Sequence, residues 1–386
     1  MTGPLPLDGI RVVEFSHMVM GPTCGLILAD LGAEVIKVEP PGEGDRTRQL
    51  TSSGTGFFAA FSRNKLSVQL DPGSEADMGR LLALVDTADV LVENFRPGGL
   101  DAKGLGYPAL SARNPRLVYC SLKGFLSGPY ENRTALDEVV QMMSGLAAMT
   151  GPPGRPLRAG APVNDMMGGM FGAIGVLAAL RQRDATGHGQ HVQAGLFENA
   201  AFLVSTHMLQ QAITGSPPPS MAAGKRAWGV YDVFEASDST QLFIGVVTDR
   251  QWRLFTEALG EEALRDPAWA TNTSRAQGRD VLIPLVQRLV GTRTAVELEQ
   301  LCERAGLPFA RIAQPGDLYA DPHLLHGGLL PLTLPDGTVT SVPALPLQFG
   351  TERLIVRHDP PCPGAHTAAV LDALPPTPAS PRPIPV

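Results

Sequence analysis

The sequence decides its fold in three consecutive segments: IRVVEF at residues 10–15, PTCGLILADL at residues 22–31 and AEVIKV at residues 33–38. The first and third are short and rich in β-branched residues, as buried strands are. The middle segment has the length and the apolar spacing of a helix. A strand, a helix and a second strand in this order predict a β-α-β unit with parallel strands and a right-handed crossover.

The same alternation continues along the chain. A helix is predicted over residues 74–87 and a long one over residues 165–183, and a helical pattern also begins near Asp137. Further strands are predicted at residues 67–70, 90–95, 116–122 and 191–196. Strands alternating with helices predict an α/β fold, here a doubly wound, Rossmann-like parallel sheet with helices on both faces.

The chain divides at a proline-rich linker, GSPPPS at residues 215–220. Its 386 residues exceed what one hydrophobic core usually fills, which favours two domains. We expect a large domain over residues 1–214 and a smaller α/β domain over residues 225–325. A C-terminal segment at residues 330–374 should return to the large domain, and residues 375–386 form a proline-rich tail.

Composition excludes several classes of protein. Hydrophobic residues make up 44% of the chain and charged residues 18%, as in a globular enzyme. The net charge of -7 argues against a nucleic-acid partner, and no uninterrupted apolar run predicts a membrane span. The four cysteines form no Cys-x-x-Cys pair, so no metal site is expected and a cytoplasmic location fits. The turn after the first strand lacks the Gly-x-Gly-x-x-Gly spacing of dinucleotide sites.

Four segments together resemble the class III CoA-transferase family, which includes formyl-CoA transferase, carnitine CoA-transferase and the α-methylacyl-CoA racemases. They are LDGIRVVEF at residues 7–15, GAEVIKVEP at residues 32–40, VENFRPG at residues 92–98 and TGHGQ at residues 186–190. The resemblance implies an interlocked homodimer. It also implies that coenzyme A is a substrate and that no cofactor is tightly bound.

The family's nucleophilic aspartate lies in a motif like APVNDMMGG at residues 161–169, which implies that Asp165 is catalytic. At a predicted helix start, free amides and the helix dipole should keep this carboxylate ionised. Gly168 and Gly169 leave one helix face nearly bare, and we expect the substrate to approach there. Read alone, Asp165 would be only the N-cap of a helix. The glycines, which are costly inside a helix, and the resemblance favour the nucleophile.

Coenzyme A carries several phosphate charges, so an acidic chain must bind it with local basic residues. The basic candidates stand near predicted strand ends, where ligands of open α/β sheets collect. They are Lys37, Arg46, Arg96 and Lys103. The resemblance adds His17 and Asn94 to the residues expected to line the coenzyme A site.

The racemase branch exchanges an α-proton through a histidine, and Leu136 stands in its place here. Leucine cannot transfer a proton, so 2-methylacyl-CoA racemase is the alternative and a transferase is favoured. Leu136 and Asp137 are expected to line the substrate. We therefore expect transfer of CoA from a donor such as succinyl-CoA or acetyl-CoA to a small mono- or dicarboxylic acid. A non-catalytic CoA-binding module would not need Asp165, which the sequence keeps.

Overall fold

The computed structural model describes residues 3–223 and 227–375, so residues 376–386 of the expected tail lie outside the described residues. The contacts between Cα atoms divide the chain into two compact units. The first unit contains the chain up to Thr150, Arg155–Pro218 and the chain from Pro322 onward. The second unit contains Gly151–Gly154 and Pro219–Asp321. The chain thus leaves the first unit and later returns to it.

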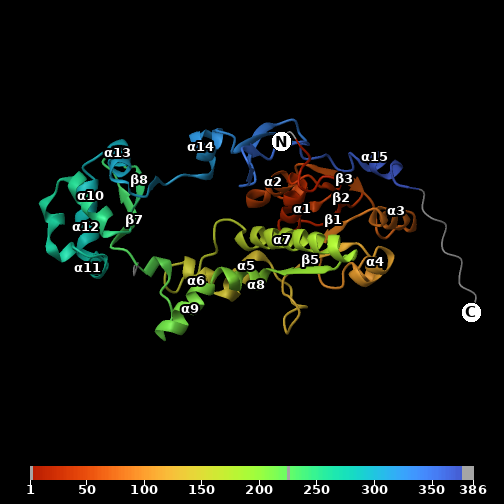
Figure 1. The fold of residues 1–386 in the computed structure, drawn as a ribbon, viewed down its shortest axis with the longest axis horizontal. Helices are drawn as coiled ribbons and strands as arrows, with labels where there is room; N and C mark the ends of the chain where they lie inside the picture. The colour runs from red at the N-terminus through yellow and green to blue at the C-terminus, as the bar shows by residue number, and fades with distance from the viewer. Residues whose placement is uncertain (1–2, 224–226, 376–386) are drawn as a thin grey trace, which may run out of the picture. The chain divides into compact units, whose positions relative to one another are not determined.

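The first unit is built on a six-stranded parallel sheet with the strand order β3-β2-β1-β4-β5-β6 (Figure 1). The predicted α/β fold with a parallel sheet is confirmed. The strands are β1 Arg11–Phe15, β2 Glu34–Glu39, β3 Lys65–Gln69, β4 Val90–Glu93, β5 Val118–Lys123 and β6 His191–Gly195. Their observed bounds differ from the predicted ones by one to two residues at most ends, because strand ends carry little sequence signal.

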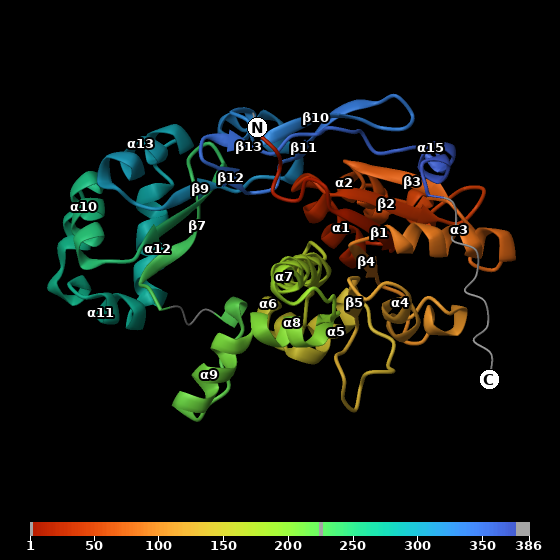
Figure 2. The ribbon, with the colours of Figure 1, turned by 45° about the vertical axis from the view of Figure 1, so that its right-hand side comes forward.

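Helices cover both faces of this sheet, because successive side chains of a strand point to opposite faces. Val12 of β1 packs in one core with the helices α1 (Met20–Asp30) and α7 (Val163–Thr186). Its neighbour Val13 packs in the opposite core, which includes residues of α3 (Glu75–Asp86) and α4 (Tyr107–Arg113). Figure 2 shows the helices of the two layers around the strands.

The long helix α7 lies in the core of the first unit. It extends two residues before and three residues beyond the predicted range, with Pro162 as its N-cap and Gly187 at φ 76° closing its C-terminus. It has the length and composition to cross a membrane, but it packs against α1, β5 and β6, and core helices of globular proteins also pass this test. Because α7 begins at Val163, Asp165 lies in its first turn and is not the N-cap.

Shorter helices pack beside α7. They are α2 (Phe57–Phe61), α5 (Asp137–Ser144), α6 (Leu146–Thr150), α8 (Leu196–Leu203) and α9 (Ser205–Thr214). The helices α8 and α9 are separated at Val204. Among these, α5 and α8 contact each other and both contact α7, so they surround its first turns.

The second unit has its own core around an antiparallel sheet. Its strands are β7 (Val230–Glu235), β8 (Gln241–Val246) and β9 (Phe309–Arg311). Its helices are α10 (Asp249–Leu259), α11 (Asn272–Gln277), α12 (Arg279–Val290) and α13 (Ala295–Ala305). One face of the sheet packs on these helices, because Phe234 and Ile244 share a core with α10, α12 and α13.

The C-terminal part of the first unit contains two hairpins and two short helices. They are α14 (Pro322–Leu325), β10 (Leu329–Thr333), β11 (Val339–Pro343), β12 (Gln348–Phe349), β13 (Glu352–Arg353) and α15 (Thr367–Asp372). The chain before α15 lies along the outer strand β3, where the Ser67 amide donates to Nδ1 of His366 at 3.1 Å. The returning segment therefore covers the edge of the large sheet.

Candidate active site

Polar residues lie where β1 and β4 end side by side. In the strand order 3-2-1-4-5-6 this is the topological switch point, at which α/β proteins bind ligands. The amide of His17 donates to Oδ1 of Asn94 at 3.0 Å, and Nδ2 of Asn94 donates to the His17 carbonyl at 2.8 Å. The His17 ring lies 5.4 Å from that of Phe95. The two residues predicted to line the coenzyme A site are thus joined to each other.

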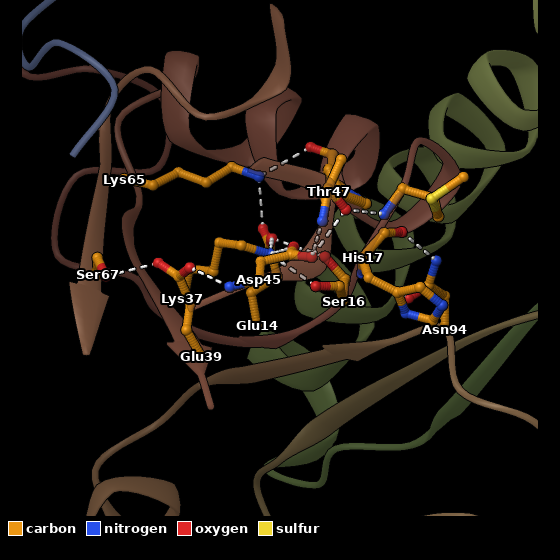
Figure 3. A network of polar contacts seen from close by, with 12 residues as sticks. Glu14, Ser16, His17, Lys37, Glu39, Asp45, Thr47, Lys65, Ser67 and Asn94 are labelled. Atoms are coloured by element: carbon orange, nitrogen blue, oxygen red, sulfur yellow. Dashed lines mark hydrogen bonds and ion pairs between the residues drawn. The ribbon is translucent and has the colours of Figure 1, made fainter. Parts of the chain in front are cut away.

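A buried network of charges lies beside His17 and Asn94 (Figure 3). The Lys37 ammonium lies 2.8 Å from Asp45 and donates to the Ser16 carbonyl at 2.6 Å. The Lys65 ammonium lies 2.7 Å from Glu14, which is fully buried. Two lysines therefore share a set of protein carboxylates away from solvent.

The network fixes the loop that carries His17. Burial opposes the charge on Lys37, but Glu14 and Asp45 outweigh it and raise the Lys37 pKa. Asp45 in turn accepts a hydrogen bond from Thr47 at 2.7 Å, and the Thr47 hydroxyl accepts the Met18 amide at 2.9 Å. Met18 has φ 63°, an unusual value for a residue with a side chain, and these contacts hold it there. The buried ammonium of Lys37 thus stabilises the loop that carries His17 through its contact with Asp45.

The helix α7 approaches the same loop through its glycines. A Cβ atom on Gly168 would collide with the Met20 side chain, and one on Gly169 would collide with the α1 backbone at the Met20 carbonyl. Both glycines are buried. They allow α7 to lie directly against the first turn of α1, which follows the His17 loop. In this structure their bare face contacts α1, and a contact with substrate stays a prediction.

Asp165 projects from the first turn of α7 beside other carboxylates. Burial, followed by the charges of Asp137 and Glu138, raises the pKa of Asp165 to about 7. The structure differs here from the expectation that free amides keep Asp165 ionised. Oδ2 of Asp137 accepts the amides of Asn164 at 2.8 Å and of Asp165 at 3.0 Å, so these donors are already used. Within the described part of the chain, the Asp165 carboxylate itself accepts no hydrogen bond.

The two residues predicted to line the substrate at the start of α5 differ in their surroundings. Leu136 is 60% exposed, whereas the Asp137 side chain is buried under α7. Next to them, Glu138 forms an ion pair of 3.5 Å with Arg158, and both are exposed. Leu136 is therefore the one of the predicted pair that presents its side chain to solvent near Asp165.

Three predicted phosphate-binding residues, Arg46, Arg96 and Lys103, are exposed. Among the described residues they form no ion pair with a protein carboxylate, in contrast to Lys37. Arg96 lines a cavity of about 350 Å³ that lies beside the end of β4 and along β5 and β6. Lys123 lines it too and is paired with Glu93 at 2.5 Å.

Sequence reasoning missed several polar residues around Asp165. Asn199 of α8 donates from Nδ2 to the Asn164 carbonyl at 2.8 Å. Gln141 donates to Oδ1 of Asp137 and accepts the Ala159 amide at 2.8 Å. Asp137 was predicted from the sequence, where it is an acidic residue at the start of a helix. No sequence signal marks Asn199, because its role depends on how α8 packs on α7.

The first unit thus has an α/β fold with polar residues at the switch point of its parallel sheet and a partly buried carboxylate at the start of the long helix α7. The chain belongs to CoA-transferase family III, whose family model matches residues 7–367. The resemblance seen in the sequence is thereby confirmed, and the chain is a CoA-transferase family enzyme.

Its relatives include the succinyl-CoA–D-citramalate CoA-transferase of Chloroflexus aurantiacus, which is 33% identical over 83% of this chain and 82% of that protein. The succinate–glutarate CoA-transferase of Agrobacterium fabrum is 33% identical over 96% of both chains. A crystal structure of a CAIB/BAIF family protein from Brucella suis is 32% identical, with a TM-score of 0.86 over 97% of this chain and 100% of that chain.

Proposed function

We propose that this enzyme moves CoA from an acyl-CoA donor to a small carboxylic acid, with Asp165 as the nucleophile that carries the acyl group. The observation that carries the proposal is a carboxylate that accepts no hydrogen bond within the described chain, held in the first turn of a helix that packs on α1, the helix that follows the His17 loop. A free carboxylate suits this reaction because the substrate is itself a carboxylate of similar energy.

The reaction needs only exchanges between carboxylates and a thiolate. An Asp165 oxygen attacks the donor thioester carbon, the C–S bond breaks, and the CoA thiolate leaves an aspartyl-acyl anhydride. The thiolate then attacks the aspartyl carbonyl, which releases the donor acid and gives an aspartyl-CoA thioester. The acceptor carboxylate attacks this thioester, and the released thiolate takes the acceptor acyl group from the second anhydride. Asp165 is regenerated and no net proton is transferred.

Two relatives named above carry succinyl-CoA or succinate in their names, and we infer that succinyl-CoA is the favoured donor over acetyl-CoA. The same names contain dicarboxylic acids as the second substrate, so a small dicarboxylate is the favoured acceptor. We assign the coenzyme A phosphates to the exposed cations Arg46, Arg96 and Lys103, since Lys37 is paired inside the protein. His17 and Asn94 would hold the part of coenzyme A that reaches the switch point of the sheet.

Replacement of Asp165 tests the role of the nucleophile. Because Asp165→Ala removes the acyl carrier, transfer should fall by at least about 10³-fold while coenzyme A still binds. Hydroxylamine added to wild type with succinyl-CoA should modify the peptide that contains Asp165, and this modification should be missing from the variant. Retained turnover in Asp165→Ala, or a label on Asp137 or Glu138, would show that the nucleophile is elsewhere.

A further inference from the structure

The peptide unit that joins Asn164 to Asp165 is held at both of its polar ends by other helices. Asn199 of α8 donates to the Asn164 carbonyl at 2.8 Å. Asp137 of α5 accepts the Asp165 amide at 3.0 Å. This carbonyl and this amide belong to one planar unit, so fixing both ends fixes the orientation of the plane and of the Cα atom that follows it.

The two side chains that hold this unit are both buried. Asp137 and Asn199 are each no more than 5% exposed. Oδ1 of Asp137 accepts a hydrogen bond from Gln141, which also accepts the Ala159 amide at 2.8 Å and so cannot turn its amide without losing a contact. Asp137 is therefore held by several hydrogen bonds, whereas Asn199 is held by burial and by its one donated hydrogen bond, because its Oδ1 has no partner among the described residues.

We propose that Asp137 and Asn199 are positioning residues that clamp the Asn164–Asp165 peptide unit from two sides, and that they set both the direction and the charge state of the nucleophile. This inference rests on the proposed role of Asp165. Asp137 acts twice, because its hydrogen bonds hold the backbone and its negative charge opposes ionisation of Asp165. Asn199 acts on the backbone only, since it is uncharged.

Charged groups near Asp165 come from more than one element. On α5 these are Asp137 and Glu138, and both raise the pKa of Asp165 after burial, the largest cause. Arg158, in the loop before α7, is paired with Glu138. Among the described residues, α8, which also contacts α7, carries the acidic Glu198, and Glu198 accepts the Leu126 amide. Among other side chains, Asp137 therefore has the largest effect on the pKa of Asp165.

The clamp predicts different effects for two substitutions. Asp137→Asn keeps the shape and an oxygen that can accept α7 amides, but it removes the charge, so the acid limb of the rate should move to lower pH. Asn199→Leu keeps the volume and removes the donor, so the plateau rate should fall by about 10- to 100-fold with no shift of the acid limb. The KM for succinyl-CoA should change little in either variant.

The quantity to measure is the rate of acyl transfer to Asp165, obtained by rapid quench with succinyl-CoA. It is measured at about ten pH values between pH 5 and pH 9. Asp184→Asn serves as a charge control, because Asp184 is exposed and lies about 28 Å further along α7. At that distance its charge is screened by salt. This variant should reproduce the wild-type profile, and thermal melts should show that all variants are folded.

An acid limb of Asp137→Asn that coincides with wild type would overturn the clamp, as would an Asn199→Leu plateau equal to that of Asp184→Asn. These outcomes are distinct from a failure of the proposed function. If Asp165 is labelled in every variant but the limb does not move, only the clamp is wrong. If Asp165→Ala still turns over, the nucleophile itself is wrong.

Discussion

At the scale of single residues, the charge on Asp165 depends on pH near neutrality. Burial and the Asp137 carboxylate raise its pKa to about 7 from an ordinary value of 3.8. A nucleophile must be ionised to attack, so activity should rise with pH through this value. The same shift also affects stability, because a group that binds a proton more tightly in the folded state stabilises that state only when protonated.

The stability effect has a defined sign. Between about pH 4 and pH 7 the folded protein still holds the Asp165 proton that the unfolded chain has lost, so the free energy of unfolding falls as pH rises through this window. Asp165→Asn removes the ionising group. We expect the variant to melt close to wild type at pH 4 and at least about 2 °C higher at pH 8, measured by scanning calorimetry.

The exposed Asp184 on the same helix provides the matched control. Asp184→Asn should follow the wild-type melting temperature at both pH values. An increase in melting temperature for Asp165→Asn that is the same at pH 4 and pH 8 would mean that the surroundings do not raise the pKa of the Asp165 carboxyl.

The sequence predicted some of these residues and not others, for physical reasons. Asp165 stood in a recognisable motif, and the structure places it in the first turn of α7. His17 and Asn94 followed strand ends and are joined by reciprocal hydrogen bonds. The burial of Lys37 and the contact of Asn199 could not be read from sequence, because both depend on distant elements. Burial turns a basic residue from a candidate ligand of phosphate into a partner of Glu14 and Asp45.

At the scale of elements, the glycines of α7 set how close this helix lies to α1. Glycine inside a helix costs about 1 kcal/mol relative to alanine, so a glycine kept there indicates a close contact. A Cβ atom on Gly169 would lie 2.6 Å from the Met20 carbonyl oxygen, which belongs to the backbone and cannot simply rotate away. The close packing of α7 on α1 therefore requires a residue without a side chain.

Gly169→Ala should lower the free energy of unfolding by about 1–3 kcal/mol, because the overlap with α1 outweighs the gain in helix propensity. Gly79 in α3 is the matched control, since nothing lies within 4 Å of its added Cβ atom. Gly79→Ala should raise stability by up to about 1 kcal/mol. Denaturant unfolding of both variants decides the point, and a stabilising Gly169→Ala would contradict the close packing.

Element types were predicted better than element ends. The alternation of strands and helices in the sequence predicted the strands of the parallel sheet, because buried strands have a strong and local apolar signal. The break between α8 and α9 at Val204 was not predicted, since no glycine or proline marks it. For the second unit, the sequence predicted a smaller α/β domain. In the structure its strands β7 and β8 pair antiparallel.

At the scale of the whole molecule, the first unit exposes an apolar surface on α7, α8 and α9. Its residues include Met170, Ile174, Phe202, Met208, Leu209 and Ile213, each at least 49% exposed. Monomers rarely expose large contiguous apolar surfaces, and obligate dimers bury them. The excursion of the chain through the second unit and its return at Pro322 are compatible with interlocked chains.

We therefore expect an obligate homodimer, in which the chains interlock and the apolar surface is covered. Light scattering coupled to size exclusion should give twice the mass of 40.9 kDa at low micromolar concentration. Ile213→Glu places a charge in this surface and should reduce the dimer fraction, whereas Val339→Glu, at an exposed residue of β11, should not. A stable, active monomer of wild type would contradict the prediction.

The central claim is that an oxygen atom of Asp165 takes part in each transfer, and isotopic oxygen tests it most directly. When the acceptor acid attacks the aspartyl-CoA thioester and the thiolate then removes the acceptor acyl group, one acceptor oxygen stays on Asp165. The enzyme is incubated with succinyl-CoA and a dicarboxylic acceptor labelled with heavy oxygen in both carboxyl groups, and its peptides are analysed by mass spectrometry. The account predicts heavy oxygen on Asp165 only, and only when both substrates are present. An unlabelled Asp165 after many turnovers would contradict it.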